Sequence, residues 1–583
     1  MKRRSFFSFL MVGVAVLLLT GISGCSWLGR PLSLSSRQTT PAAAIFVPKQ
    51  APVMVSMLVN PNQIDSLGQV VTRGERQKVR AELNQLKTSL LANTGLDYRQ
   101  DIQPWIGDEI TLAVTTADID RDATNGRQTG YLMAIATKNA EKSREFLDLL
   151  FSKRAIAGTD LMFEQYKGIK LISDNQRATA TQNSKLNGQP ELPPAASLRK
   201  LKAQNLVGAV VGEHFVLFAN HPKVLRDAIN NVQAPDLNLT TSSQYQQALT
   251  LLPPQRIGLT FLNLPSIIAW QGLEPAAQTY ESQIIALELN RKGLLADIAL
   301  LAAPNQDSPP APALSQPGGA LQYIPATTGF SISGSDLSRL GNSNLSQLWQ
   351  QSKLTGSNDG GISRLVNQPL TDIQARWGIE LPKDIFSWVQ GEYALGLLPH
   401  EAQTDPDLIF VAEKSSGAEQ GISHLDALAQ QQGLSITPLS LENQKVFAWT
   451  QLTTAPKSTS DPDSSSIALK AKVQGVHTTA GNYEIFTTSV EAMTEALKAS
   501  KNGALVDNSQ FQASIDAIPK PNAGYVYLDW TASKTIIERQ LPILKLFEVV
   551  GLPFFNNLRS LTVSSYGSET GLLKGGIFFR LNN

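Results

Sequence analysis

The chain has 583 residues, of which 42% are hydrophobic and 17% are charged. This composition is that of a globular protein and excludes a wholly disordered chain. The length exceeds what one hydrophobic core usually holds, so we expect at least two large domains. The formal net charge is +1, from 50 basic and 49 acidic residues. This balance disfavours nucleic acid as a partner, because phosphate binding needs a concentrated basic face.

The N-terminus has the pattern of an export signal. Lys2, Arg3 and Arg4 form a positive segment, and an apolar run of signal-peptide length follows at residues 6–19. Residues 22–25 read Ile-Ser-Gly-Cys and resemble the lipobox of bacterial lipoproteins, in which the leader is removed and the cysteine is acylated. Cleavage there removes three of the 50 basic residues and no acid, which leaves a net charge of −2.

Cys25 is the only cysteine of the chain, and we expect it to carry fatty acyl chains such as palmitate. The alternatives are an uncleaved membrane anchor or a buried thiol, but the apolar run is short for a membrane span. Two or three acyl chains hold a protein at a membrane far more firmly than one. The expected location is therefore the periplasmic face of the plasma or outer membrane, or the thylakoid lumen.

A stretch at residues 95–114 has a similar counterpart at residues 378–397. The matched positions lie at a constant spacing and are Gly95, Asp101, Trp105 and Glu109 in the first stretch, and Gly378, Asp384, Trp388 and Glu392 in the second. This match predicts a tandem duplication of a domain. The predicted division is a signal peptide at 1–24, a tether at 25–40, repeat domain 1 at 41–302, a Pro- and Gly-rich linker at 303–319, and repeat domain 2 at 320–583.

The pattern of apolar residues predicts the same kinds of element in both copies. In the first copy, we expect strands at 53–58, 109–114 and 131–137, and a hairpin that ends at 214–218. Helical spacing relates two sets of apolar residues, which are Val79, Leu83, Leu86 and Leu90, and Val224, Leu225, Ala228 and Ile229. Because hairpins outnumber crossovers, we expect largely antiparallel sheets with packed helices, an α+β class. The first half of each copy could form a ferredoxin-like β-α-β-β-α-β unit.

The export signal, followed by two copies of the Gly, Asp-Ile, Trp and Glu pattern, resembles an exported, chiefly cyanobacterial family known only as a domain of unknown function. The resemblance covers nearly the whole mature chain. It implies a setting in the cell envelope or thylakoid lumen, and it implies no catalytic residue.

Motifs of enzyme chemistry are missing from the sequence, which has no GxSxG, HExxH, P-loop or CxxC pattern. The histidines stand alone, without the spacing of zinc ligands; they are His214, His221, His400, His424 and His477. We therefore expect no enzyme activity, no cofactor and no metal. The matched Asp, Trp and Glu residues suit a structural role, in which Asp101 or Asp384 caps a turn and the tryptophan fills the core.

Three aspartates begin a spacing that is similar to a calcium-binding EF-hand loop. They are Asp118, Asp120 and Asp122, but Ala123 replaces the required glycine and Thr129 stands at the position of the bidentate glutamate. We therefore expect a hairpin loop at this place.

The two copies differ most at residues 541–555, which are strongly apolar only in the second copy. The segment either packs in the core or exposes an apolar patch for a partner or a membrane. We predict the exposed patch, with contributions from Leu544, Phe547, Phe554 and Phe555.

Three functions are compatible with the sequence. The first is a membrane-anchored, non-catalytic binding or assembly factor, whose partner is a membrane or envelope protein. The second is a carrier of lipid or another hydrophobic ligand, and the third is an enzyme with an unrecognised site. A large apolar cavity would favour the carrier, a polar cleft with titratable groups the enzyme, and filled cores the binding factor.

Overall fold

The computed structural model divides the chain into two compact units. Unit 1 comprises Met1–Leu289 and Ala299–Ala303, and unit 2 comprises Asn290–Ile298 and Pro304–Asn583. The structure describes residues 40–60, 96–122, 124, 126–174, 206–272, 280–290, 292–302, 314–335, 337, 371, 374–399, 406–456, 467–533, 557–569 and 571–581. The predicted signal peptide, nearly all of the tether, most of the linker and the predicted helix at 79–90 lie outside these residues.

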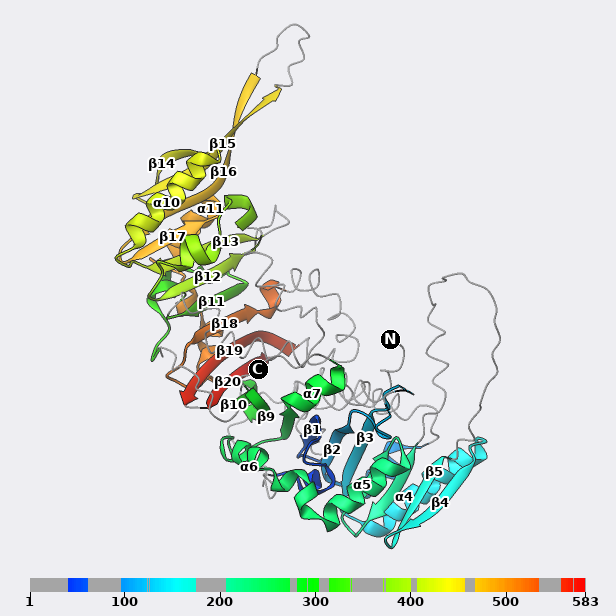
Figure 1. Cartoon of the computed structure of the whole chain (residues 1–583). Helices are drawn as coiled ribbons and strands as arrows, with labels where there is room; N and C mark the ends of the chain where they lie inside the picture. Colours follow the sequence, from blue (N-terminus) through cyan, green and yellow to red (C-terminus); the bar gives the residue numbers. More distant parts are fainter. Residues whose placement is uncertain are drawn as a thin grey trace, which may run out of the picture. The chain divides into compact units, whose positions relative to one another are not determined.

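Unit 1 is built on antiparallel strands (Figure 1). The strands are β1 (Val53–Met57), β2 (Ile106–Thr116), β3 (Gly130–Thr137), β4 (Leu161–Tyr166), β5 (Ile169–Asp174), β6 (Val207–Val211), β7 (Phe215–Ala219), β8 (Gly258–Asn263) and β9 (Tyr280–Asn290). The α-helices are α4 (Ala140–Ile156), α5 (Pro222–Gln233), α6 (Ser243–Thr250) and α7 (Leu264–Gln271). Short helical turns are η1 (Ala42–Phe46), η3 (Tyr98–Ile102), η6 (Pro235–Leu237) and η7 (Leu239–Thr241).

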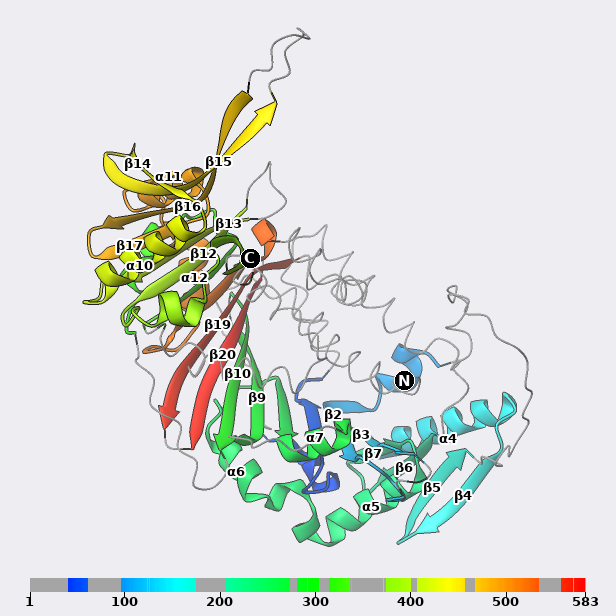
Figure 2. The same cartoon turned by 45° about the horizontal axis from the view of Figure 1, so that its top comes forward.

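Neighbouring strands of unit 1 follow the order β4-β5-β6-β7-β3-β2-β1-β8-β9, and each pairing is antiparallel. Figure 2 shows β3, β7, β6, β5 and β4 side by side. The register places Val53 of β1 opposite Val114 of β2 and Leu262 of β8. Residues far apart in the sequence therefore meet in the middle of the sheet.

Strand β7 explains how α4 and α5 pack on this sheet. All five of its residues are buried and apolar, as expected for a strand covered on both faces. Val216 and Phe218 belong to the core that contains Phe146 and Phe151 of α4. Phe215, Leu217 and Ala219 belong to a separate core that contains the buried face of α5. Successive side chains of a strand point to opposite faces, so α4 and α5 cover opposite sides of the sheet.

Unit 2 also consists mainly of strands. They are β11 (Phe330–Gly334), β12 (Tyr393–Leu398), β13 (Asp407–Glu413), β14 (Ser435–Leu441), β15 (Gln444–Pro456), β16 (Ile467–Ala480), β17 (Tyr483–Thr487), β18 (Gly524–Asp529), β19 (Leu558–Glu569) and β20 (Leu572–Leu581). Strand β10 (Gly293–Ala302) is divided between the units. The helices are α10 (Ala418–Gln431), α11 (Val490–Ala499) and α12 (Ser509–Ile515), with short turns η8 (Gly319–Tyr323), η10 (Leu381–Phe386) and η11 (Leu505–Asp507).

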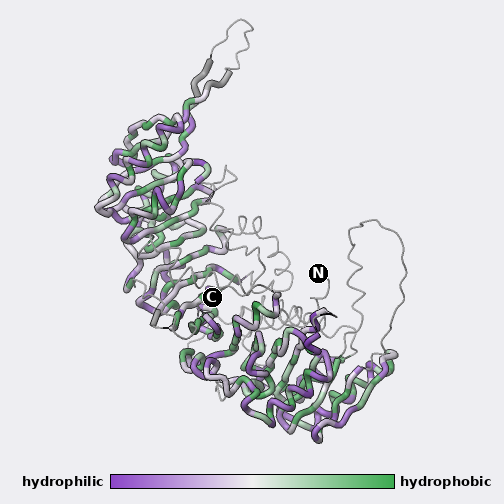
Figure 3. The backbone as a smooth tube through the Cα atoms, viewed as in Figure 1, coloured by the Kyte–Doolittle hydropathy of each residue, from purple (hydrophilic) through white to green (hydrophobic). Residues whose placement is uncertain are grey.

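The strands of unit 2 follow the order β14-β15-β16-β17-β13-β12-β11-β18-β19-β20, again with antiparallel pairings. A core on one face of this sheet joins α11 and α12 to alternate residues of β12, β13 and β18, which include Ala394, Ile409 and Tyr525. Figure 3 shows apolar residues distributed along the strands of both units.

The predicted fold class is wrong. We expected a tandem α+β duplication with ferredoxin-like halves, whereas the strands belong to one 20-stranded sheet. A ferredoxin-like β-α-β-β-α-β unit has two strands between its two helices. Here four strands, β4 to β7, lie between α4 and α5, and they continue the sheet through β3. Local periodicity indicates strands and helices, but it does not determine which distant strands pair.

Candidate functional site

Several predicted site residues lie outside the described part of the chain. They are the acylation residue Cys25, the first matched residue Gly95, and the proposed patch residues Leu544, Phe547, Phe554 and Phe555. Acylation and the apolar patch therefore stay predictions.

The matched residues of unit 1 form a compact turn before β2. The Asp101 carboxylate accepts a hydrogen bond from the Asp97 backbone N–H at 2.8 Å, and the Trp105 indole N–H donates to the Asp101 carbonyl, also at 2.8 Å. Trp105 is only 1% exposed, and its ring packs on Phe146 of α4 at a centroid distance of 4.9 Å. These contacts fix the turn to the core beneath α4.

The matched residues of unit 2 make the same two hydrogen bonds. The Asp384 carboxylate accepts from the Glu380 backbone N–H at 2.7 Å, and the Trp388 indole N–H donates to the Asp384 carbonyl at 2.8 Å. Trp388 is buried against α10, where a Cβ on Gly421 would lie 2.5 Å from the indole nitrogen. Gly378 has a φ of +60°, a conformation that favours glycine. In both units these residues support the fold locally.

The matched glutamates differ in their surroundings. Glu109 is 1% exposed and accepts hydrogen bonds from the backbone N–H groups of Ala42 and Ala43, both at 2.9 Å, and from the Thr111 hydroxyl at 2.8 Å. Burial raises the pKa of Glu109, although these three hydrogen bonds act in the opposite direction. The carboxylate therefore fastens η1 to β2 in unit 1.

Glu392 lies nearer the surface and is linked to a tyrosine. Its carboxylate accepts hydrogen bonds from the Gly319 backbone N–H at 2.6 Å and from the Tyr483 hydroxyl at 3.2 Å. Burial, followed by the negative charge of Glu392, raises the pKa of Tyr483 to about 12. Tyr323 packs on Tyr483 with ring centroids 5.6 Å apart. This cluster ties η8 to β17 and to Glu392, the residue that precedes β12.

Unit 2 contains an apolar pocket that the sequence did not reveal. Its lining comes from the end of β11, the segment around η10, and strands β12 and β13. The residues that line it are Ile332, Leu337, Trp377, Leu381, Ile385, Phe386, Tyr393, Leu395, Leu408 and Phe410. The free space is about 30 Å³ and the exposed lining is apolar throughout.

The pocket lies on the sheet face opposite the α11 core. Ile332 pairs with Leu395, which pairs in turn with Phe410, so these side chains share one face. Their neighbours in sequence, Ala394 and Ile409, belong to the core on the other face. A strand that is apolar on both faces needs cover on both. Apolar residues at consecutive positions of β12 and β13 are the pattern from which a second covered face of the sheet could have been predicted.

Trp377 fixes one wall of the pocket. Its indole N–H donates to the Gln474 carbonyl at 2.8 Å, and the Gln432 side chain donates to the Trp377 carbonyl at 2.6 Å. The ring also packs edge-on against Trp449 at 5.4 Å. These contacts hold the wall between α10 and the β15-β16 hairpin, so the pocket is preformed on rigid elements.

Two histidines that looked isolated in sequence pair with aspartates around α10. His424 of α10 lies 3.2 Å from the Asp384 carboxylate, and His477 of β16 lies 3.0 Å from that of Asp426 in α10. Burial would raise the pKa of Asp426, but hydrogen bonds from His477 and Trp449 outweigh it and lower this pKa. Both pairs join α10 to the rest of unit 2.

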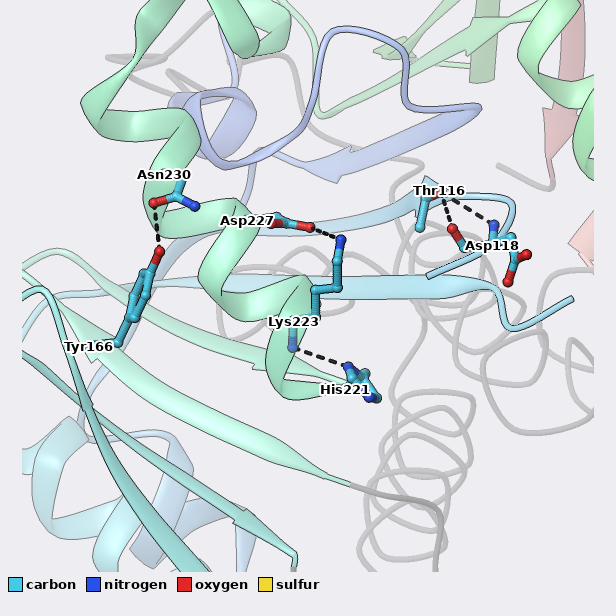
Figure 4. A network of polar contacts seen from close by, with 7 residues as sticks. All are labelled: Thr116, Asp118, Tyr166, His221, Lys223, Asp227 and Asn230. Carbon is cyan, nitrogen blue, oxygen red and sulfur yellow. Dashed lines mark hydrogen bonds and ion pairs between the residues drawn. The ribbon is translucent and has the colours of Figure 1, made fainter. Parts of the chain in front are cut away.

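A polar network surrounds α5 in unit 1 (Figure 4). His221 caps the helix by accepting a hydrogen bond from the Lys223 backbone N–H at 3.1 Å, and burial lowers its pKa. Lys223 pairs with Asp227 at 3.0 Å, and the Tyr166 hydroxyl of β4 donates to the side-chain amide oxygen (Oδ1) of Asn230 at 2.9 Å. The network anchors α5 on the β4-β5 hairpin.

The aspartate-rich loop joins β2 to β3, as a hairpin loop should. The Thr116 hydroxyl bonds to the Asp118 carbonyl within it at 2.9 Å (Figure 4). In the described part of the chain, no three histidine, cysteine or acidic residues are grouped so as to hold a metal ion. The helices described also include none long and apolar enough to cross a membrane.

Comparison with known proteins identifies the family. The model of the family described as "Protein of unknown function (DUF3352)" matches residues 10–581, so the chain belongs to this family. No curated protein matches the chain.

Two solved structures have weak similarity to the chain. "Structure of crystal form I of TP0453" has 8% identity and a TM-score of 0.24, covering 46% of this chain and 80% of that one. "Structure of crystal form IV of TP0453" has 9% identity and the same TM-score, covering 46% and 83%. Similarity at this level carries no argument about function.

Proposed function

We propose that this protein is a membrane-anchored, non-catalytic binding or assembly factor, which holds an apolar group of a partner protein in the unit 2 pocket. The apolar pocket among Trp377, Leu395 and Phe410 is the observation that carries the proposal. An apolar pocket with preformed walls binds apolar groups because it removes their surface from water.

The size of the pocket favours a side chain over a lipid. Free space of about 30 Å³ is more than one water needs but far less than an acyl chain occupies. Space of this size takes the end of one apolar side chain, and each CH₂-sized group buried contributes about 0.8 kcal/mol. This contribution alone gives weak binding, because partners lose translational and rotational freedom when they associate. A single pocket of this kind suits a factor whose partner is already close by.

The membrane anchor would supply that proximity. The Ile-Ser-Gly-Cys segment ending at Cys25 supports acylation and a position on the periplasmic or thylakoid-lumen side of a membrane, in keeping with a cyanobacterial lipoprotein. Tethering to the same membrane raises the effective concentration of a partner without a new contact. The partner class is therefore a membrane or envelope protein with an exposed apolar side chain.

Co-purification from solubilised membranes, with the anchor intact, tests the proposal. Leu395→Phe should fill the pocket, whereas Leu452→Phe changes a surface leucine of the same unit that is 58% exposed. We expect a partner that is retained by the wild type and by Leu452→Phe but is lost from Leu395→Phe. Filling a cavity should leave the thermal midpoint unchanged or higher. Retention of the same partners by Leu395→Phe would show that the pocket does not bind them.

A further inference from the structure

Strand β4 is an open edge of the unit 1 sheet. Among the described strands it pairs with β5 alone. The two are joined by Lys167 and Gly168, with φ of 47° and 80°, as in a two-residue type I′ hairpin. In such a hairpin the closing pair, here Tyr166 and Ile169, is hydrogen-bonded, and bonded and non-bonded pairs then alternate. The backbone groups of Leu161, Phe163 and Gln165 therefore point away from β5.

Large apolar side chains are exposed on both faces of this edge. Met162 is 48% exposed and Phe163 is 61% exposed. Adjacent residues of a strand point to opposite faces, so one apolar group flanks the open edge on each side. Proteins usually protect such edges, because an exposed apolar edge pairs readily with another chain.

The charged residues that flank Phe163 are paired within unit 1. Glu164 pairs with Arg226 at 3.0 Å, and Lys170 pairs with Asp148 at 3.3 Å while its ammonium lies 5.4 Å from the Phe163 ring centroid. An incoming segment opposite Phe163 would therefore find the charges of Glu164 and Lys170 already in use. Electrostatic complementarity at this position favours an uncharged segment.

The corresponding edge of unit 2 is protected. Among the described strands β14 pairs only with β15, through a two-residue turn at Glu442 and Asn443 with φ of 50° and 64°. Pro438 lies three residues before Leu441, which closes this turn. Phe163 has the equivalent position in β4, three residues before Tyr166. Proline has no N–H to donate to an added strand. The outward position that is blocked in β14 is therefore open in β4.

We propose that β4 binds an extended, uncharged and apolar segment of a partner polypeptide as an additional antiparallel strand. Backbone hydrogen bonds from Leu161, Phe163 and Gln165 would supply the pairing, and Met162 and Phe163 would select apolar residues at consecutive positions. A second copy of this chain fits less well. Six residues span about 20 Å, and one such strand pair falls short of the roughly 1,600 Å² that a stable dimer buries. The edge belongs to unit 1 and acts independently of the unit 2 pocket.

A fluorescent peptide tests this proposal on the full chain by anisotropy. The probe is a short run of Val and Ile with terminal lysines for solubility, and the control is the same peptide with alternate backbone nitrogens methylated. We expect the probe to bind, the methylated peptide to bind at least about tenfold more weakly, and Phe163→Pro to weaken the probe by a similar factor. Gln165→Pro removes a second outward N–H, so it should also weaken binding of the probe.

Each alternative has a distinct result. Phe163→Leu keeps the N–H and an apolar side chain, so it should bind the probe nearly as the wild type does. Equal binding of the methylated peptide, or binding within twofold by both proline variants, would overturn the proposal. Dimerisation in sedimentation that Phe163→Pro abolishes would also overturn it, because the occupant would then be a second copy. None of these results depends on the Leu395→Phe experiment.

Discussion

Replacement of Trp105 by alanine should destabilise unit 1 severely. The side chain is 1% exposed, packs on Phe146 at 4.9 Å and donates a 2.8 Å hydrogen bond to the Asp101 carbonyl. Loss of a buried tryptophan costs about 3–5 kcal/mol through lost burial and the remaining cavity. Trp105→Phe keeps much of the packing but loses the hydrogen bond, which contributes about 0.5–1.5 kcal/mol.

Hydrogen exchange measured by mass spectrometry localises this effect to unit 1. A free-energy difference of about 1.4 kcal/mol corresponds to a factor of ten. With a loss of about 3–5 kcal/mol, the amides of α4 and β7 that exchange through unfolding of the whole unit should exchange on the order of a hundred- to several-thousandfold faster in Trp105→Ala. The matched control is Leu149→Ala on the exposed side of α4, where a change within about 0.5 kcal/mol is expected. A loss below about 1 kcal/mol in Trp105→Ala would refute the assignment of this residue to the core.

Three further predictions concern titration and anchoring. Because the folded-state pKa of Glu109 is raised above 4.5, the folded chain binds this proton more tightly than the unfolded chain does. Unit 1 should therefore lose stability as pH rises from about 4.5 through the folded pKa, and Glu109→Gln should lack this slope in thermal midpoint against pH. Tyr483 should ionise near pH 12 in an absorbance titration, and nearer its ordinary value of 10.0 in Glu392→Gln, although burial should keep it above that value. An unchanged titration would show that Glu392 does not act on it. Cys25→Ala should accumulate as an uncleaved precursor without acyl label, and equal labelling of the mutant would disprove acylation at this residue.

Local elements could be predicted from the sequence because their signals are local. Apolar residues at helical spacing marked Val224, Leu225, Ala228 and Ile229, and these residues are the buried face of α5. The strand expected at residues 131–137 is β3, one residue longer. In both cases periodicity alone reports which side of the element is buried.

The pairing of strands and the pocket could not be predicted in this way. Strand β3 pairs with β7 across the whole α4 and β4-β5 segment, and no local pattern specifies that choice. The pocket depends on Ile332, Trp377, Leu395 and Phe410, which come from separate segments and meet only through the sheet register. The matched Asp and Trp residues were more conspicuous in sequence, yet they do not line the pocket, although Asp384 belongs to the turn η10 that does.

Photo-crosslinking from the pocket tests the central claim most directly. Benzoylphenylalanine would replace Phe386, a half-buried lining residue, in the full chain with its anchor intact in native membranes. We predict a crosslink to an apolar residue of a membrane or envelope protein, and its loss when Leu395→Phe is added. Crosslinks to lipid alone, or a protein crosslink that persists in the presence of Leu395→Phe, would contradict the claim that this pocket holds an apolar group of a partner protein.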